Sequence, residues 1–270
     1  MSFKEKVSDI IYRKKTTLIA GVDPAEFEMG RGEKGLPRDV LKFDWTIEYI
    51  KAIAPFSLGI KLNAGYWMGE NDIKAMKEIV KFAKSQNLIV IMDSKIADIG
   101  STNDAWMYYW QKLGFDAITI APYAGNIEDA INTAKNRNLG VFSMGLMSNP
   151  EFKTEMNFKN KDGIPLWQTR SQRALQAGVD GLVLGGTYNK DDVELINFLD
   201  ITKKSDTLYL VPGIGEQGGK LGDFYLSGID ANRALINVGR GLMFCNGQNT
   251  TPEDQARVAS KLQYEIQKYL

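Results

Sequence analysis

The chain has 270 residues, with 33 lysines and arginines balanced by 33 aspartates and glutamates. A net charge of zero creates no whole-protein field to attract nucleic acid or an anionic membrane, so we expect neither as a partner. Histidine is absent and Cys245 is the only cysteine, which excludes His-dependent triads, disulfide frameworks and cysteine-based zinc sites. Any proton chemistry must therefore use carboxylates, lysine or tyrosine.

The N-terminal segment and the hydropathy of the chain bear on its location. The first 15 residues are charged and amphipathic and lack the apolar core of a signal peptide. No apolar run approaches the roughly 20 residues that span a bilayer. Together with the single cysteine, these features lead us to expect a protein of the reducing cytoplasm.

Short apolar runs recur along the chain, and most are followed by a helical pattern. They are nearly continuous rather than alternating, which is typical of parallel strands covered on both faces. The predicted strands are Thr17–Val22, Ser57–Leu62, Leu88–Met92, Ala117–Ala121, Gly140–Gly145, Gly181–Gly185, Leu208–Val211 and Ala234–Val238. Helical patterns between them include Asp72–Lys84, Asn103–Leu113, Asn126–Asn136 and Asp191–Leu199.

Eight such repeats in this length favour an α/β fold, a (β/α)8 TIM barrel that forms one domain over residues 1–270. A doubly wound open sheet is the alternative. Three long connections, Pro24–Arg38, Asn149–Gly163 and Glu216–Asp230, follow predicted strand ends. Because barrel active sites are built on that face, we expect these connections to be lids or binding loops, with solvated insertions as the alternative.

The densest signal for chemistry follows the third predicted strand, where Asp93, Lys95 and Asp98 lie within six residues. On an extended chain Asp93 and Lys95 point to the same face, because side chains alternate with a period of two. Asp98 lies past the strand end and need not face the same pocket. A lysine flanked by carboxylates should stay protonated, but an ion pair followed by a helix cap would also explain the pattern.

Charged residues follow the first two predicted strands as well. Asp23 ends the first strand and Lys61 ends the second. Buried charges are costly unless they are paired. A solvated rim would explain any one of these residues, whereas charges at three consecutive repeats favour an alternating Lys/Asp network in one pocket.

Two glycine-rich segments lie at the ends of the seventh and eighth predicted strands: Val211-Pro212-Gly213-Ile214-Gly215-Glu216-Gln217-Gly218-Gly219 and Asn237-Val238-Gly239-Arg240-Gly241. Barrels often bind phosphate there, because glycines let backbone amides approach the oxygens and an arginine can clamp two of them. Tight turns alone are the alternative. Ser148 follows the fifth strand, where a turn or N-cap serine is an equally simple interpretation.

The combined pattern resembles the orotidine 5'-monophosphate decarboxylase family. The matching residues are Asp93-x-Lys95-x-x-Asp98 with Thr102, Lys61 after strand two, Met147-Ser148-x-Pro150, the glycine segment from Pro212 and Gly239-Arg240. The resemblance extends over about residues 17 to 245. Each motif is weak alone, whereas their order along the chain is highly specific.

The resemblance implies a role for each residue in a cofactor-free and metal-free decarboxylation. Asp23 and Lys61 would hold ribose hydroxyls, Asp93 would position Lys95, and Lys95 would supply the proton. Asp98 and Thr102 would reach the neighbouring subunit's site, which implies a homodimer with shared active sites. Ser148 would contact the pyrimidine, while the residues after strands seven and eight would hold the 5'-phosphate: Pro212, Gln217, Gly239 and Arg240.

Two alternatives to this function remain. A Mg²⁺-dependent barrel similar to 3-keto-L-gulonate 6-phosphate decarboxylase shares the Asp-x-Lys-x-x-Asp strand, but would need a carboxylate where Lys61 stands. A non-catalytic barrel that binds phosphate esters would keep Arg240 and the glycines without needing the lysines. The sequence also departs from many members of the family, since Gly100 occupies a position where proline is common.

Overall fold

The computed structural model describes residues 1–147, 149–214 and 219–270. Eight parallel strands form a closed barrel in chain order, and β8 pairs with β1. They are β1 (Leu18–Gly21), β2 (Gly59–Asn63), β3 (Ile89–Ile96), β4 (Ala117–Ile120), β5 (Gly140–Leu146), β6 (Gly181–Leu184), β7 (Leu208–Pro212) and β8 (Ala234–Val238). Closure confirms the predicted (β/α)8 barrel and excludes the open sheet.

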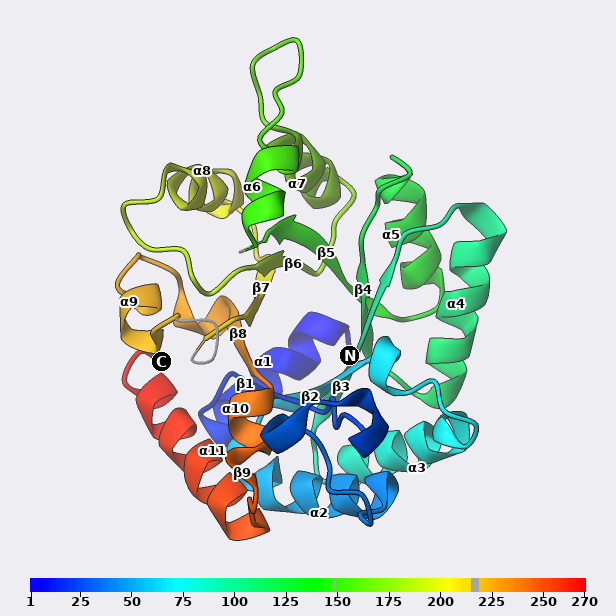
Figure 1. Cartoon of the computed structure of the whole chain (residues 1–270). Helices are drawn as coiled ribbons and strands as arrows, with labels where there is room; N and C mark the ends of the chain where they lie inside the picture. Colours follow the sequence, from blue (N-terminus) through cyan, green and yellow to red (C-terminus); the bar gives the residue numbers. More distant parts are fainter. Residues whose placement is uncertain (148, 215–218) are drawn as a thin grey trace.

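Helices surround the barrel (Figure 1). They are α1 (Phe3–Lys14), α2 (Lys42–Ile53), α3 (Asp72–Ser85), α4 (Gly100–Leu113), α5 (Ile127–Asn136), α6 (Pro150–Met156), α7 (Leu166–Gln176), α8 (Val193–Thr202), α9 (Leu221–Tyr225), α10 (Arg240–Met243) and α11 (Pro252–Gln267). A short ninth strand, β9 (Cys245–Gln248), lies outside the barrel order. Among the described residues, no helix combines the length and apolar character needed to cross a membrane.

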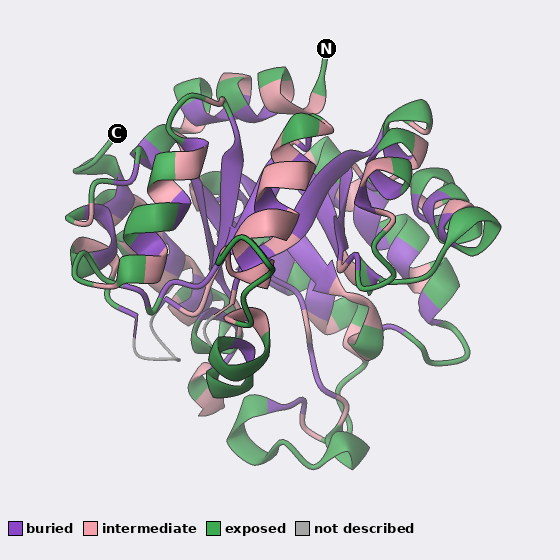
Figure 2. Cartoon of the chain, turned by 90° about the horizontal axis from the view of Figure 1, so that it is seen from above, coloured by how far each residue is buried: buried purple, intermediate pink, exposed green. Residues whose placement is uncertain are grey.

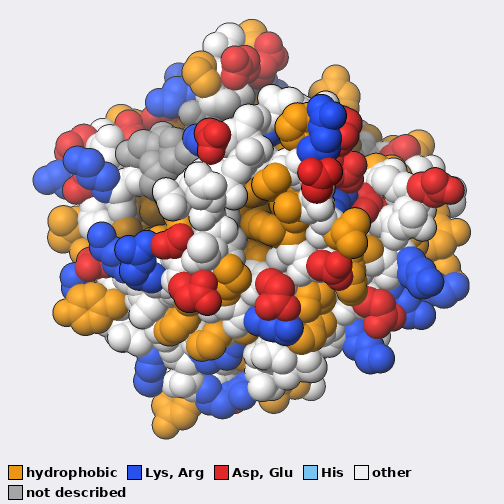
Figure 3. Space-filling view, turned by 60° about the horizontal axis from the view of Figure 1, so that its bottom comes forward, with side chains coloured by type: hydrophobic (Ala, Val, Ile, Leu, Met, Phe, Trp, Pro, Cys, Tyr) orange, Lys and Arg blue, Asp and Glu red, His pale blue; other side chains and the backbone are white. Residues whose placement is uncertain are grey.

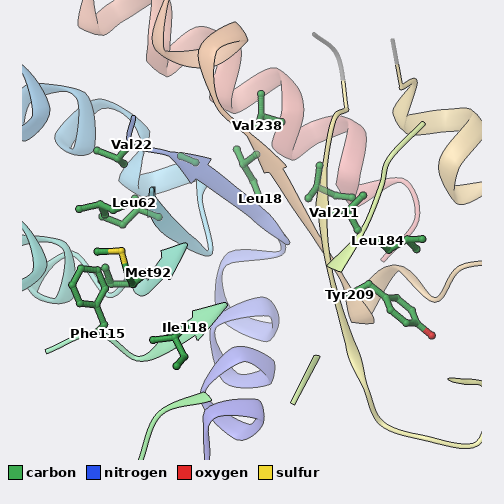
Figure 4. Packing of buried hydrophobic residues seen from close by; sticks show 14 of the residues in the cluster. Leu18, Val22, Leu62, Met92, Phe115, Ile118, Leu184, Tyr209, Val211 and Val238 are labelled. Carbon is green, nitrogen blue, oxygen red and sulfur yellow. The ribbon is translucent and has the colours of Figure 1, made fainter. Parts of the chain in front are cut away.

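The strands are buried on both faces, as their continuous apolar sequences predict (Figure 2). One face packs against the surrounding helices, as with Leu62, Met92 and Val211 (Figure 4). The other face fills the barrel interior, where Ile91 and Phe142 form a separate cluster with residues of α1.

Helix α1 packs against one end of this interior. Val7, Ile10 and Ile11 are buried in the interior cluster, and the Phe3 ring meets Phe142 edge-to-face at 5.8 Å. The helix begins with a capping box in which the Ser2 and Glu5 side chains each accept the other's backbone amide. The opposite end of the barrel, at the carboxyl ends of the strands, is therefore the end available for a site.

One predicted strand boundary needs correction, and the long connections contain short helices for which no prediction was made. The third predicted strand ended at Met92, but β3 continues through the charged residues to Ile96. The long connections are also not wholly irregular: Pro24–Arg38 contains the short 3-10 helices Phe27–Met29 and Gly32–Lys34, Asn149–Gly163 contains α6, and the third connection contains α9. Polar sequences in these segments hid short helices that lack a long apolar period.

The backbone conformation at Gly100 accounts for a glycine where proteins of the resembled family commonly have proline. It is the first residue of α4 and has a φ of 42°. Proline is held near −65° and cannot adopt that angle. The chain therefore enters α4 by a left-handed turn that suits glycine.

Candidate active site

The inward face of the barrel becomes polar at the carboxyl ends of the strands. Residues two positions beyond inward apolar residues share their direction. Asp93 follows Ile91, Thr119 follows Ala117, and Asn237 follows Leu235 in this way. Apolar layers thus end in a polar layer at one mouth of the barrel.

Lys61, Asp93 and Lys95 form a continuous ion-pair network in that layer. Lys61 Nζ lies 2.8 Å from Asp93 Oδ2, and Lys95 Nζ lies 2.6 Å from Asp93 Oδ1. Lys61 is only 6% exposed, whereas the Lys95 side chain is 44% exposed. One carboxylate therefore holds a buried ammonium on one side and presents an accessible ammonium on the other.

The protonation preferences of these groups follow from burial and neighbouring charge. Burial alone would raise the pKa of Asp93, but the Lys61 and Lys95 charges hold that pKa well below its usual range. Burial alone would lower the pKa of Lys61, yet Asp93 and Asp23 raise it above its ordinary value. Asp93 is thus held as a carboxylate and Lys61 as an ammonium group.

Asp23 belongs to the same electrostatic environment. Its Oδ1 accepts the backbone amide of Asn63 at 2.8 Å, which ties the end of β1 to the end of β2. Burial raises the pKa of Asp23, and the Lys61 charge only partly opposes that rise. Asp23 therefore faces a higher cost for its charge than Asp93 does.

The arrangement of Asp93 and Lys95 arises from a strand irregularity that simple alternation did not predict. Met92 pairs with Ile118 and Ile96 pairs with Ile120, so four residue steps on β3 face two steps on β4. Lys95 consequently has a left-handed φ of 45°. Asp93 and Lys95 do lie together, as predicted. Regular alternation along an extended strand does not explain this, because β3 is irregular between Met92 and Ile96.

A cavity of about 410 Å³ opens beside the network. Its lining combines Lys61, Asp93 and Lys95 with Thr119, Met144, Met147, Asn149, Val183, Thr187, Leu210, Pro212 and Asn237. The charged groups and Thr119 come from the neighbouring strands β2, β3 and β4, while β5, β6 and β7 contribute mainly apolar side chains. Such a mixed lining suits a small ligand with both polar and apolar parts.

The sequence singled out Pro212 in this lining, but no role was predicted for Thr119 or for Asn237. Thr119 Oγ1 donates to Asp93 Oδ1 at 2.9 Å, and Asn237 Nδ2 donates to the Ile19 carbonyl at 3.0 Å. Both residues lie within apolar β runs, where a threonine or asparagine carries no motif. The alternation of inward residues was the signal available for finding them.

Asp98 and Thr102 lie outside the lining of this cavity. Both are exposed, and the Asp98 carbonyl accepts the side-chain amides of Asn103 at 2.6 Å and Asn126 at 3.2 Å. The structure therefore separates Asp98 from Asp93 and Lys95, as the end of the strand suggested.

The segments after β7 and β8 are described only in part. Gly239 precedes α10 and Arg240 is its first residue. The two segments are adjacent, because β7 pairs with β8 through Pro212 and Asn237. Two predicted residues, Ser148 and Gln217, lie outside the described residues.

In the described ranges 1–147, 149–214 and 219–270, no group of three or more Asp, Glu, His or Cys side chains is arranged to hold a metal ion. Asp93 in the cavity lining pairs with Lys61 and Lys95 instead, and the charge of Lys61 also acts on Asp23.

Fold and site together define a barrel enzyme with a Lys/Asp network at the carboxyl ends of its strands. The chain belongs to the orotidine 5'-phosphate decarboxylase / HUMPS family, whose model matches residues 17–249. It is 30% identical over 288 residues to the orotidine 5'-phosphate decarboxylase of Thermomicrobium roseum, covering 99% of this chain and 96% of that protein.

Solved structures have the same fold. A Streptomyces avermitilis protein, provisionally named orotidine 5'-phosphate decarboxylase, superposes with a TM-score of 0.83 at 25% identity, over 99% of this chain and 95% of its own. The Methanocaldococcus jannaschii orotidine 5'-monophosphate decarboxylase, solved with the inhibitor BMP, superposes with a TM-score of 0.69 at 22% identity. That match covers 92% of this chain and 97% of the other.

Proposed function

We propose that this chain decarboxylates orotidine 5'-monophosphate to uridine 5'-monophosphate, the last step of de novo pyrimidine biosynthesis. The observation that supports this most directly is the Lys61–Asp93–Lys95 network on the wall of the cavity. Relatives that match nearly the full chain are orotidine 5'-phosphate decarboxylases. A lysine at position 61 also disfavours the Mg²⁺-dependent alternative, since it places positive charge where that site needs a carboxylate.

The network suits the chemistry of this reaction. Loss of CO2 from C6 leaves an electron pair on a ring carbon with no adjacent carbonyl to delocalise it. Lys95 supplies a pre-placed positive charge that stabilises this carbanion, and then gives its proton to C6. Asp93 holds the ammonium in place, so little reorganisation is needed during the reaction.

Ground-state repulsion is a smaller contribution. In our proposal Asp98 of a neighbouring subunit lies near the substrate carboxylate. Two like charges about 4 Å apart repel by roughly 4 kcal/mol at an effective dielectric of about 20. That energy corresponds to about three powers of ten in rate if it is fully relieved, so stabilisation of the carbanion by Lys95 must supply the larger share.

Other residues bind the nucleotide in this proposal. Asp23 and Lys61 hold the ribose hydroxyls, and Ser148 contacts the pyrimidine. The 5'-phosphate is held next to β7 and β8 by Pro212, Gln217, Gly239 and Arg240. Since these two strands are neighbours, their loops supply one anion site, and its binding energy holds the base against Lys95.

We also propose a homodimer with shared active sites. Asp98 and Thr102 are exposed and lie outside their own chain's cavity lining. Large apolar and aromatic side chains near them are exposed too, including Ile99, Trp106 and Tyr109. A partner chain that packs on these side chains would place Asp98 and Thr102 beside the partner's cavity. This arrangement would account for their position outside the cavity of the chain that carries them.

Two further proposals concern organisation and location. Residues 1–270 form a single domain, because α11 packs with the same core as the barrel strands through Ala259 and Ile266. The protein works in the cytoplasm, where its free Cys245 stays reduced. Positive and negative side chains are interspersed on the face shown in Figure 3, which agrees with a protein that has no strong single-sign surface field.

The test is turnover of orotidine 5'-monophosphate by the purified chain without added cofactor, followed by the loss of orotate absorbance. Activity should be the same with and without excess chelator. Binding of the nucleotide without turnover would favour a non-catalytic barrel instead. Turnover of 3-keto-L-gulonate 6-phosphate that requires Mg²⁺ would favour the metal-dependent alternative.

A further inference from the structure

The Thr119 side chain lies between the two residues that matter most to the proposed chemistry. Its hydroxyl donates to Asp93 Oδ1 at 2.9 Å and accepts the backbone amide of Lys95 at 2.9 Å. Thr119 is 1% exposed and also lines the catalytic cavity. A single buried atom on β4 therefore contacts both the carboxylate and the backbone of the proton donor.

The strand irregularity explains why this hydroxyl is needed. Between the Met92–Ile118 and Ile96–Ile120 pairs, β3 leaves the regular ladder and Lys95 takes its left-handed φ of 45°. That conformation is unfavourable for a residue with a side chain, so neighbouring groups must hold it. Thr119 Oγ1 accepts the Lys95 amide at this irregular point of the ladder.

The hydroxyl also has a fixed polarity. A threonine hydroxyl has one proton to donate. Since its oxygen accepts the Lys95 amide, that proton is directed to Asp93. The same Oδ1 accepts Lys95 Nζ at 2.6 Å, so Thr119, Asp93 and Lys95 close a ring of three hydrogen bonds in which each member fixes the next.

We propose that Thr119 is a positioning residue for the decarboxylation, which sets the place of the Lys95 ammonium through both the Lys95 backbone and the Asp93 carboxylate. This inference rests on the proposed function. It adds a residue outside the motifs that identify the family, since Thr119 lies on β4 in the run Ala117-Ile118-Thr119-Ile120. Thr119 acts through Lys95 and need not touch the substrate.

A merely structural role predicts a different pattern of effects. If the hydrogen bonds of the Thr119 hydroxyl only stabilised the fold, removal of the hydroxyl would lower the melting temperature and leave the kcat of the folded enzyme unchanged. A positioning role predicts a fall in kcat with little change in nucleotide binding, because displacement of a catalytic group by about 1 Å can cost about 10²-fold in rate.

The test compares Thr119→Val, which keeps the shape and removes the hydroxyl, with Thr119→Ser, which keeps the hydroxyl. We expect Thr119→Val to lower kcat about 10²-fold, while the Kd for uridine 5'-monophosphate stays close to that of the wild type. Thr119→Ser should recover most of kcat. Thr46→Val is the matched control, since Thr46 is a fully buried threonine on α2 that donates to the Lys42 carbonyl.

Each outcome has a distinct meaning. Wild-type kcat in Thr119→Val overturns the positioning role, as does a Thr119→Ser variant that is as slow as Thr119→Val. Should Thr119→Val not fold, Thr119→Ala removes the same hydroxyl without the second branch, and its kcat must fall while Thr119→Ser stays active. An inactive wild type would instead refute the proposed function, so the two failures are distinguishable.

Discussion

Lys95 donates to Asp93 at 2.6 Å although the two residues do not follow the regular alternation of a strand. The Lys95 backbone is left-handed, and its side chain is far more exposed than that of Lys61 on the other side of the carboxylate. The irregularity thus aims a charged group into the cavity while its counter-ion remains buried.

Removal of the Lys95 side chain should abolish catalysis and preserve nucleotide binding. We expect Lys95→Ala to lower kcat by at least about 10³-fold, the upper range for loss of one pre-placed charge or donor in an active site. The Kd for uridine 5'-monophosphate, measured by calorimetry, should change much less. Lys77→Ala, on the exposed face of α3, is the matched control, and an active Lys95→Ala enzyme contradicts the assignment.

Asp93 and Asp23 should respond in opposite ways to neutralisation. Asp93→Asn leaves buried Lys61 without its ion pair and should destabilise the fold by about 3 kcal/mol at pH 7. Asp23→Asn keeps an oxygen for the Asn63 amide and removes a charge that burial disfavours. Its free energy of unfolding should therefore be equal to that of the wild type or higher. Urea unfolding of both variants checks this, and equal losses would be inconsistent with the two pKa directions.

The contribution of Asp93 to stability should depend on pH with a definite sign. Its pKa is lower in the folded state than in the unfolded state, because the two lysines favour the carboxylate. The stabilisation is therefore complete above the unfolded pKa of about 4 and is lost as the pH falls below it. The difference in unfolding free energy between wild type and Asp93→Asn should be constant from pH 7 to pH 5 and shrink below pH 4.

Gly100 gives a prediction about stability alone. Its φ of 42° is unfavourable for alanine and closed to proline. We expect Gly100→Ala to destabilise by about 1 kcal/mol, and Gly100→Pro by about 3 kcal/mol or more. Gly65→Ala is the control, because a Cβ there would make an ordinary contact with Asn63 at 3.5 Å. A Gly100→Pro variant as stable as wild type would show that α4 can begin with the family's common residue.

The sequence was sufficient for the barrel but not for its irregularities. Continuous apolar runs predict buried parallel strands, and charged residues after three of them predict a polar mouth. The left-handed φ of Lys95 depends on how β3 pairs with β4, which no local pattern encodes. Alternation after the inward-facing Ala117 could have placed Thr119 at the mouth of the barrel, but its contacts with Asp93 and Lys95 depend on the same pairing of β3 with β4. The role proposed for Asp98 needs a second chain, which the sequence of one chain does not place.

Arg240 should act through the phosphate of the substrate. Hydrogen bonds to charged groups contribute about 1.5 to 3 kcal/mol, so Arg240→Ala should weaken binding of uridine 5'-monophosphate by about 10- to 100-fold. Binding of uridine, which has no phosphate, should not change. Arg257→Ala controls for loss of an exposed arginine that pairs with Asp254. An equal loss for the nucleoside and the nucleotide would place Arg240 away from the phosphate.

The proposed shared sites can be tested by complementation. Asp98→Ala and Lys95→Ala chains should each be inactive as homodimers. If the opposite chain supplies Asp98, one site of a mixed dimer carries both substitutions and the other carries neither. Random mixing gives heterodimers in half of the population with one intact site of two, so about a quarter of wild-type activity should return.

The same mixture discriminates against sites built within one chain. If each cavity used its own Asp98, every site in the heterodimer would keep one lesion and no activity would return. The chains must first be shown to exchange, for example by differently sized tags that co-purify. Recovery depends on Asp98 lying at the partner's cavity, an arrangement that we propose because Asp98 is exposed and lies outside the lining of its own cavity. If proven heterodimers recover no activity, Asp98 would have to act in the site of its own chain. The segment between β3 and α4 would then have to move toward Lys95.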